Sequence, residues 1–165
     1  MGIIPQSPVL FSGTIRSNLD PFCSYTDDAI YDALDKCRMR DAVDKMTDGL
    51  QSKVAEYGEN LSQGQRQLLC LGRALLRNCK ILLLDEATSS VDYETDQAIQ
   101  VTIREAFKFC TIITIAHRVN TILDSDKILV MDNGTVGEFD SPQKLLSDKE
   151  SLFSKIVSHS SFSDD

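Results

Sequence analysis

Two aliphatic runs separated by a helix-patterned stretch form the clearest part of the hydrophobic pattern. The runs lie in Lys80–Asp85 and Thr111–Ala116, and each consists of consecutive apolar residues of strand length. Between them, Tyr93–Phe107 carries apolar residues at helical spacing. This order of strand, helix and strand predicts an open α/β sheet.

The chain before residue 80 is predicted to be mostly helical, after a shaped loop over residues 1–25 in which three prolines and Gly13 restrict the backbone. Thr26 can cap a first helix, and Ser62 with Gln65 three residues later matches a capping box. The polar stretch Gln51–Asn60 is expected to be a loop. The other predicted elements are a helix at Arg40–Met46, a hairpin with strands at 127–131 and 135–139, and short helices opened by Pro142 and containing Leu152–Val157.

Composition narrows the class of protein. The chain has 165 residues, with 17 basic and 25 acidic side chains and a net charge of −8. The acidic balance argues against a nucleic-acid partner, because phosphate binding needs a basic stripe. No run approaches the ~20 apolar residues of a membrane span. The five cysteines lack metal-ligand spacing, so they are interpreted as small packing residues in a reducing cytosol.

Four sites in the sequence carry candidate chemistry. A buried strand that ends in Asp85-Glu86 places two carboxylates at the carboxyl edge of a sheet, where the first suits Mg²⁺ and the second suits deprotonation of a water. Leu61–Gln65 opens a helix whose amide groups can bind an anion. His117 follows a strand, and Gln6 lies between two prolines. Each has an ordinary alternative: a strand ending in a polar loop, a capping box, a structural histidine and a loop residue.

The order of these motifs resembles the ATP-binding domain of ABC transporters. Pro5-Gln6 corresponds to the Q-loop, Leu61–Gln67 to the signature, Ile81–Glu86 to Walker B with the catalytic glutamate, Ser89–Asp92 to the D-loop and His117 to the switch histidine. The segment Pro5–Phe22 and the intact Glu86 resemble the second nucleotide-binding domain of subfamily C, the multidrug-resistance-associated exporters. The resemblance covers nearly the whole chain. Gln63 departs from it, because the signature usually has a small or aliphatic residue there.

The resemblance implies an α/β fold: a partial P-loop NTPase core of the RecA-like ABC ATPase type with a helical subdomain. It implies four parts, which are a Q-loop segment at 1–25, a helical subdomain at 26–78, the remaining core at 79–157 and an acidic tail at 158–165. The Walker A strand and the N-terminal β-region of such a domain are not recognised in the sequence.

The resemblance also implies residue roles with ATP and Mg²⁺ as cofactors. Asp85 and Gln6 would help hold Mg²⁺, Glu86 would be the general base and His117 would contact the γ-phosphate. In a head-to-tail ATP sandwich with a second nucleotide-binding domain, Ser62, Gly64 and Gln65 would contact the γ-phosphate of the nucleotide bound to that domain. Ser90 and Asp92 would belong to the nucleotide-binding interface and link the two sites across it. Residues around Phe11–Phe22 and Glu56–Glu59 would face the coupling helices of a transmembrane domain, on the cytoplasmic face of a membrane.

No G-x-x-x-x-G-K-[ST] motif is present, so the chain lacks the loop that cradles the phosphates. We therefore expect the chain to be the C-terminal part of the ATPase domain of an exporter. By itself it should neither fold stably nor hydrolyse ATP, because the resemblance places the Walker A strand inside the sheet and its loss would leave two inner edges unpaired. The transported substrate is not encoded in this region.

Three alternatives remain at this point. The chain could be a non-enzymatic partner that supplies its signature face to another domain, or part of a channel or channel regulator of the same subfamily. A chromosome-maintenance ATPase is disfavoured, since only 56 residues separate Gln6 from Ser62 and they lack sustained heptads.

Overall fold

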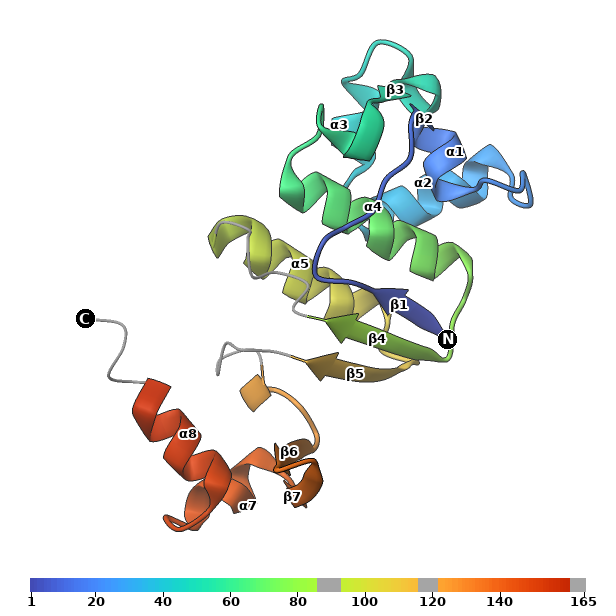
Figure 1. Ribbon diagram of the computed structural model, residues 1–165. Helices are drawn as coiled ribbons and strands as arrows, with labels where there is room; N and C mark the ends of the chain where they lie inside the picture. The colour runs from blue at the N-terminus through green and yellow to red at the C-terminus, as the bar shows by residue number, and fades with distance from the viewer. Residues whose placement is uncertain (86–92, 116–121, 161–165) are drawn as a thin grey trace. The chain divides into compact units, whose positions relative to one another are not determined.

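The computed structural model describes residues 1–85, 93–115 and 122–160 (Figure 1). The contacts divide the chain into two compact units, Met1–Ile115 and Ala116–Asp165. The boundary between the units falls after the second aliphatic strand. The four parts implied by the resemblance, divided after residues 25, 78 and 157, stay a prediction. Each unit is described by itself.

A three-stranded parallel sheet organises the first unit. Its strands are β1 (Gly2–Ile4), β4 (Ile81–Asp85) and β5 (Thr111–Ile115), in the order β1-β4-β5 (Figure 1). The register pairs Ile4 with Leu84 and Leu84 with Thr114. The two strands predicted from the aliphatic runs and the α/β class are therefore confirmed. β1 was not predicted, because three residues carry no readable periodicity and gain strand structure only by pairing with β4.

The two faces of this sheet have opposite environments. Side chains alternate along a strand, so Ile4, Leu82 and Leu84 share one face, and all three are buried. The long helices α4 (Gln63–Leu76) and α5 (Tyr93–Ala106) contribute to the same hydrophobic cluster. The opposite face carries Ile3, Ile81, Leu83, Ile113 and Ile115, of which all but Leu83 are exposed. We call these five residues the open sheet face.

Three short helices come from the first half of the unit. α1 (Ile15–Leu19) and α2 (Asp27–Lys36) pack against α4, and α3 (Arg40–Asp44) packs against α2. The Thr26 hydroxyl accepts a hydrogen bond from the backbone N–H of Ala29, which confirms the predicted cap. The expectation of a loop throughout residues 1–25 was wrong, because β1, α1 and the two-residue strand β2 (Gly13–Thr14) lie there.

The expected loop at 51–60 also contains structure. It holds strand β3 (Lys53–Val54) and the 3₁₀ turn η2 (Glu56–Gly58), after a further turn η1 (Gly49–Gln51). β2 and β3 pair antiparallel, with Gly13 opposite Val54, and the backbone N–H of Ile15 donates to the carbonyl of Ser52 at 3.0 Å. Strands this short form only through tertiary contact, so no local pattern predicted them.

The second unit is built on a hairpin. β6 (Ile128–Asp132) and β7 (Thr135–Asp140) pair antiparallel around Asn133 and Gly134, whose φ angles of 47° and 79° suit a two-residue hairpin turn. This hairpin and the two helices that follow, α7 (Pro142–Ser147) and α8 (Leu152–Ser160), confirm the predictions made for them. α8 extends beyond residue 158, where we expected the tail to begin.

A small core and a side-chain cap stabilise this unit. Ile128, Val130, Leu145 and Phe153 form its buried cluster. The carboxylate of Glu138 accepts hydrogen bonds from the backbone N–H groups of Leu152 and Phe153, at 2.7 and 3.1 Å, at the start of α8. Within the described parts of both units, no helix has the length and apolar character needed to cross a membrane.

Candidate functional site

The carboxyl edge of the parallel sheet brings Gln6 and Asp85 together. Asp85 is the last residue of β4, and Gln6 follows β1 by two residues. Because β1 and β4 run parallel with Ile4 opposite Leu84, both residues lie at the same edge of the sheet, and both are exposed. The carboxyl edge is where open α/β sheets bind ligands. Oxygen atoms from a carboxylate and an amide suit a hard cation such as Mg²⁺.

Two further predicted site residues closely follow the ends of β4 and β5 in the sequence. Glu86 directly follows Asp85, and His117 follows the last residue of β5, Ile115, by two positions. Both lie outside the described residues, as do Ser90 and Asp92. Their predicted roles therefore remain predictions.

The start of α4 forms the second group of predicted residues. The Ser62 hydroxyl accepts from the backbone N–H of Gln65 at 3.2 Å, and the backbone N–H of Ser62 donates to Oε1 of Gln65 at 2.9 Å. This reciprocal pair confirms the predicted capping box. It leaves the backbone N–H groups of Gln63 and Gly64 in the first turn, at the positive end of the helix dipole. The geometry thus suits an anion.

The capping box does not exhaust the hydrogen-bonding capacity of its side chains. A serine hydroxyl that accepts one bond retains its O–H donor, and a glutamine that accepts through Oε1 retains its NH₂ group. Ser62 is exposed and Gln65 is half-buried. Both side chains can therefore donate to a phosphate oxygen without the helix losing its cap.

Arg73 and Asn18 form a polar link that the sequence analysis missed. From the last turn of α4, the Arg73 guanidinium donates to the carbonyl of Val9 at 2.6 Å and to Oδ1 of Asn18 at 2.8 Å. Asn18, which is buried, also accepts from the backbone N–H of Phe11 and donates to its carbonyl. Burial lowers the pKa of the Arg73 guanidinium, partly offset by Cys70.

This link ties the segment after Gln6 to the helix that begins at the signature residues. Its partners lie 55 positions apart in the sequence. Asparagine and arginine are common at surfaces, so neither residue carried a sequence signal that would have paired it with the other.

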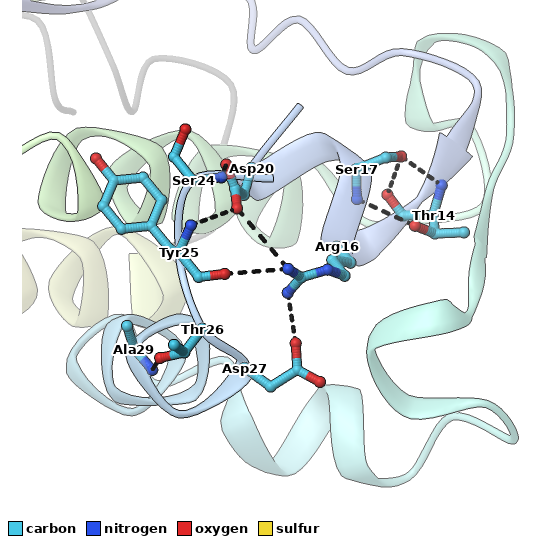
Figure 2. A network of polar contacts seen from close by, with 9 residues as sticks. All are labelled: Thr14, Arg16, Ser17, Asp20, Ser24, Tyr25, Thr26, Asp27 and Ala29. Atoms are coloured by element: carbon cyan, nitrogen blue, oxygen red, sulfur yellow. Dashed lines mark hydrogen bonds and ion pairs between the residues drawn. The ribbon is translucent and has the colours of Figure 1, made fainter. Parts of the chain in front are cut away.

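A second polar network fixes the loop between α1 and α2 (Figure 2). The buried carboxylate of Asp20 accepts from the backbone N–H groups of Ser24 at 3.0 Å and Tyr25 at 2.9 Å, and lies 3.9 Å from the Arg16 guanidinium. Arg16 also donates to the Tyr25 carbonyl and pairs with Asp27. Burial acts to raise the pKa of Asp20, but these backbone donors and Arg16 together hold it below the ordinary value.

Three aromatic side chains are exposed on or near the segments that these networks fix. Phe11, Phe22 and Tyr57 are 67%, 81% and 66% exposed. The β2–β3 pairing brings their two segments together, and Leu10 packs so closely against Gly58 that a Cβ there would lie 2.7 Å from its Cδ1. Tyr57 itself has a φ of 54°, a left-handed conformation that is uncommon for a tyrosine. We call these three residues the anchored aromatic surface.

A model of the ABC transporter family matches residues 1–89, which include the sheet edge and the start of α4. The chain belongs to the ABC transporter family. The P-loop NTPase fold of that family agrees with the parallel sheet and helices of the first unit, and the predicted family is confirmed.

Relatives place this ABC transporter chain beside members of subfamily C. It is 57% identical over 157 residues to "ABC transporter C family member 3" of Arabidopsis thaliana, covering 95% of this chain and 10% of the relative. It is 57% identical over 155 residues to "Multidrug resistance protein mrp-7" of Caenorhabditis elegans, covering 94% and 10%. It is 53% identical over 157 residues to human "ATP-binding cassette sub-family C member 4", covering 95% and 12%. The chain thus spans about a tenth of the length of these curated relatives.

Proposed function

We propose that this chain is the C-terminal part of the second ATP-binding and ATP-hydrolysing domain of a subfamily C exporter, at the cytoplasmic face of a membrane. The observation that carries the proposal is the placement of Gln6 and Asp85 at one carboxyl edge of a parallel sheet. The capped start of α4, with Ser62, Gly64 and Gln65, supports it independently.

The residues at the sheet edge divide the chemistry of phosphoryl transfer to water between them. Asp85 and Gln6 would hold Mg²⁺, which neutralises charge on the phosphates when it is bound. Glu86 would accept the proton of the attacking water, and His117 would donate to the γ-phosphate. Carboxylates at this position are suited to general-base catalysis, which contributes about 10²–10⁴-fold to a rate.

The start of α4 would serve a second nucleotide-binding domain. Its Gln63 and Gly64 amides, with the remaining donors of Ser62 and Gln65, would contact the γ-phosphate of a nucleotide held by that domain, and Ser90 and Asp92 would join the two sites. The anchored aromatic surface would face the coupling helices of the transmembrane domain. Its two segments match those expected there, Phe11–Phe22 and Glu56–Glu59.

A chimera tests the hydrolytic role. Residues 1–157 of this chain would replace the matching segment of human sub-family C member 4, and ATP hydrolysis would be measured in membranes. We expect hydrolysis in the chimera and a loss of about a hundredfold or more in Glu86→Gln. Glu105→Gln, the same change at an exposed position of α5, is the matched control and should leave the rate unchanged. A chimera that is folded and inactive, or a Glu86→Gln variant with full activity, contradicts the proposal.

The chain alone should bind and hydrolyse no ATP, because it contains no Walker A motif. Turnover of Mg-ATP by the purified chain that disappears in Glu86→Gln would contradict this statement.

A non-enzymatic role as a signature-face partner is the second candidate, favoured by the intact capping box in a chain without a Walker A motif. It requires ATP-dependent association of the chain with a complete nucleotide-binding domain. Ser62→Arg should abolish that association, while Ser141→Arg at the cap of α7 should not.

A further inference from the structure

Two of the five cysteines lie close together, one position out of register, just before the amino ends of neighbouring strands. Cys79 precedes β4 by two residues and Cys110 precedes β5 by one. The strand register pairs Ile81 with Thr111, and the backbone N–H of Thr111 donates to the carbonyl of Lys80 at 2.9 Å. The Cys110 thiol itself donates to the carbonyl of Cys79, with Sγ 2.8 Å from the oxygen. The sheet therefore fixes the spacing of the two residues.

The environment of the pair differs from that of the other cysteines. Cys79 is buried, whereas Cys110 is partly exposed and thus open to a small reagent. Among the other cysteines, Cys23 is exposed, whereas Cys37 and Cys70 are buried, and Cys70 lies 3.8 Å from the Arg73 guanidinium. Burial raises the pKa of Cys110, with a further contribution from the Cys79 thiol, and burial also raises the pKa of Cys37 and Cys70, so the pair is distinguished by its proximity and by the access to Cys110.

We propose that Cys79 and Cys110 form a thiol–disulfide site that reacts with a low-molecular-weight disulfide such as oxidised glutathione. The Cys110 thiol loses its proton to solvent and attacks one sulfur of the reagent, which releases one glutathione thiolate. The Cys79 thiol then loses its proton and attacks the Cys110 sulfur, which releases the second glutathione. Two protein thiols are oxidised to one disulfide, and one molecule of oxidised glutathione is reduced to two of glutathione.

The fold accommodates this bond without rearrangement of the strands. A disulfide needs Cα atoms about 4.4–6.8 Å apart. The register places Cys110 opposite Lys80, and residues one position out of register, with strands about 4.8 Å apart and a rise of about 3.3 Å per residue, lie about 5.8 Å apart. The lost S–H donor is a weak one. The bond would close a loop that contains β4 and α5, and it would hold the amino ends of β4 and β5 together while Asp85 stays free at the other end. The oxidised chain should therefore resist unfolding more than the reduced chain.

Peptide mapping tests the proposal directly, because trypsin separates all five cysteines. They fall in residues 17–36 (Cys23), 37–38 (Cys37), 67–73 (Cys70), 78–80 (Cys79) and 109–118 (Cys110). The purified chain would be equilibrated with oxidised and reduced glutathione in sucrose, which favours the folded state, then alkylated and digested. We expect the linked peptide 78–80/109–118 to exceed any other pair by on the order of tenfold.

Matched variants and a denatured control define the outcome. Cys79→Ala and Cys110→Ala should each abolish the linked peptide, whereas Cys23→Ala and Cys70→Ala should leave it. In guanidinium chloride the preference for the Cys79–Cys110 peptide should disappear, because the unfolded chain no longer holds these two cysteines together. The proposal is overturned if another pair dominates, if the glutathione couple yields only mixed disulfides, or if the pairing is the same with and without denaturant. None of these readouts depends on ATP hydrolysis, so the result is independent of the proposed function.

Discussion

The first unit exposes two apolar surfaces that are held in place in different ways. The anchored aromatic surface of Phe11, Phe22 and Tyr57 sits on irregular segments, and polar networks fix the segments of Phe11 and Phe22. The open sheet face of Ile3, Ile81, Leu83, Ile113 and Ile115 sits on regular strands whose backbone ladder already defines their positions.

The difference teaches where specific polar residues are needed. Irregular segments have no ladder to satisfy their backbone groups, so the buried side chains of Asn18 and Asp20 and the half-buried side chain of Arg73 supply the partners. A strand needs no such help. We therefore expect single polar substitutions to disturb the anchored aromatic surface strongly, and the open sheet face to tolerate them. Because we expect the isolated chain to be unstable, the following tests measure stability by urea unfolding in enough sucrose to populate the folded state.

Removal of the Arg73 side chain should give the largest effect. Arg73→Ala removes the hydrogen bonds to the carbonyls of Val9 and Asn18 and one of the two to Oδ1 of Asn18, so we expect a loss of about 3 kcal/mol in the free energy of unfolding. Arg77→Ala, one turn later and exposed, should change it by less than about 0.5 kcal/mol. Equal losses in the two variants would show that the link does not anchor the segment.

Asp20 should make stability depend on pH. Its pKa is lower in the folded than in the unfolded chain, so its contribution is complete above the unfolded value of about 3.9 and is lost as the pH falls through the folded value. The unfolding midpoint of the native chain should therefore fall steeply below about pH 4, and that of Asp20→Asn less steeply. Asp28→Asn, with the same change of charge on the exposed start of α2, should retain the steep profile.

Ser62→Ala should have a smaller effect, because it removes one hydrogen bond at the start of a long helix. We expect a loss of about 1 kcal/mol in the free energy of unfolding. Ser62→Asp should restore most of it, since an aspartate also accepts from the Gln65 backbone N–H. A loss that Asp fails to restore would contradict the capping role of Ser62.

Substitution on the open sheet face should have the smallest effect on stability. Ile113→Ser changes a side chain that is 52% exposed, and the expected change is within about 0.5 kcal/mol. Self-association, measured by sedimentation velocity, should decrease in this variant because an exposed apolar patch is reduced. Leu82→Ala on the buried face is the comparison, with an expected loss of about 2–5 kcal/mol. A large loss in Ile113→Ser would erase the distinction between the two faces.

Much of the fold was predictable because its elements are encoded locally. The aliphatic runs of β4 and β5, the caps at Thr26 and Ser62 and the turn at Asn133 each act over a few residues. The candidate site followed from the order of motifs, which predicted Gln6, Ser62 and Asp85 as separate candidates. The motifs identify these residues by type and order along the chain, so the prediction did not depend on the distances between them in the folded structure.

The pairing of distant segments was not predictable in the same way. β1, β2 and β3 have two or three residues each, and they exist because β4 or a partner loop satisfies their backbone groups. The Arg73–Asn18 link and the contact between Cys110 and Cys79 join residues that carry no distinctive signal on their own.

The sequence by itself determined the family, the α/β class and the residues with candidate chemistry, because helical and strand periodicity, caps and motifs are local properties of the chain. Only the tertiary structure decided that Gln6 and Asp85 share one sheet edge, that the segments of Phe11 and Tyr57 are joined through β2 and β3, and that two cysteines meet. The reason is physical: buried backbone groups must find partners, and which distant segment supplies them depends on the whole packed chain rather than on any stretch of it.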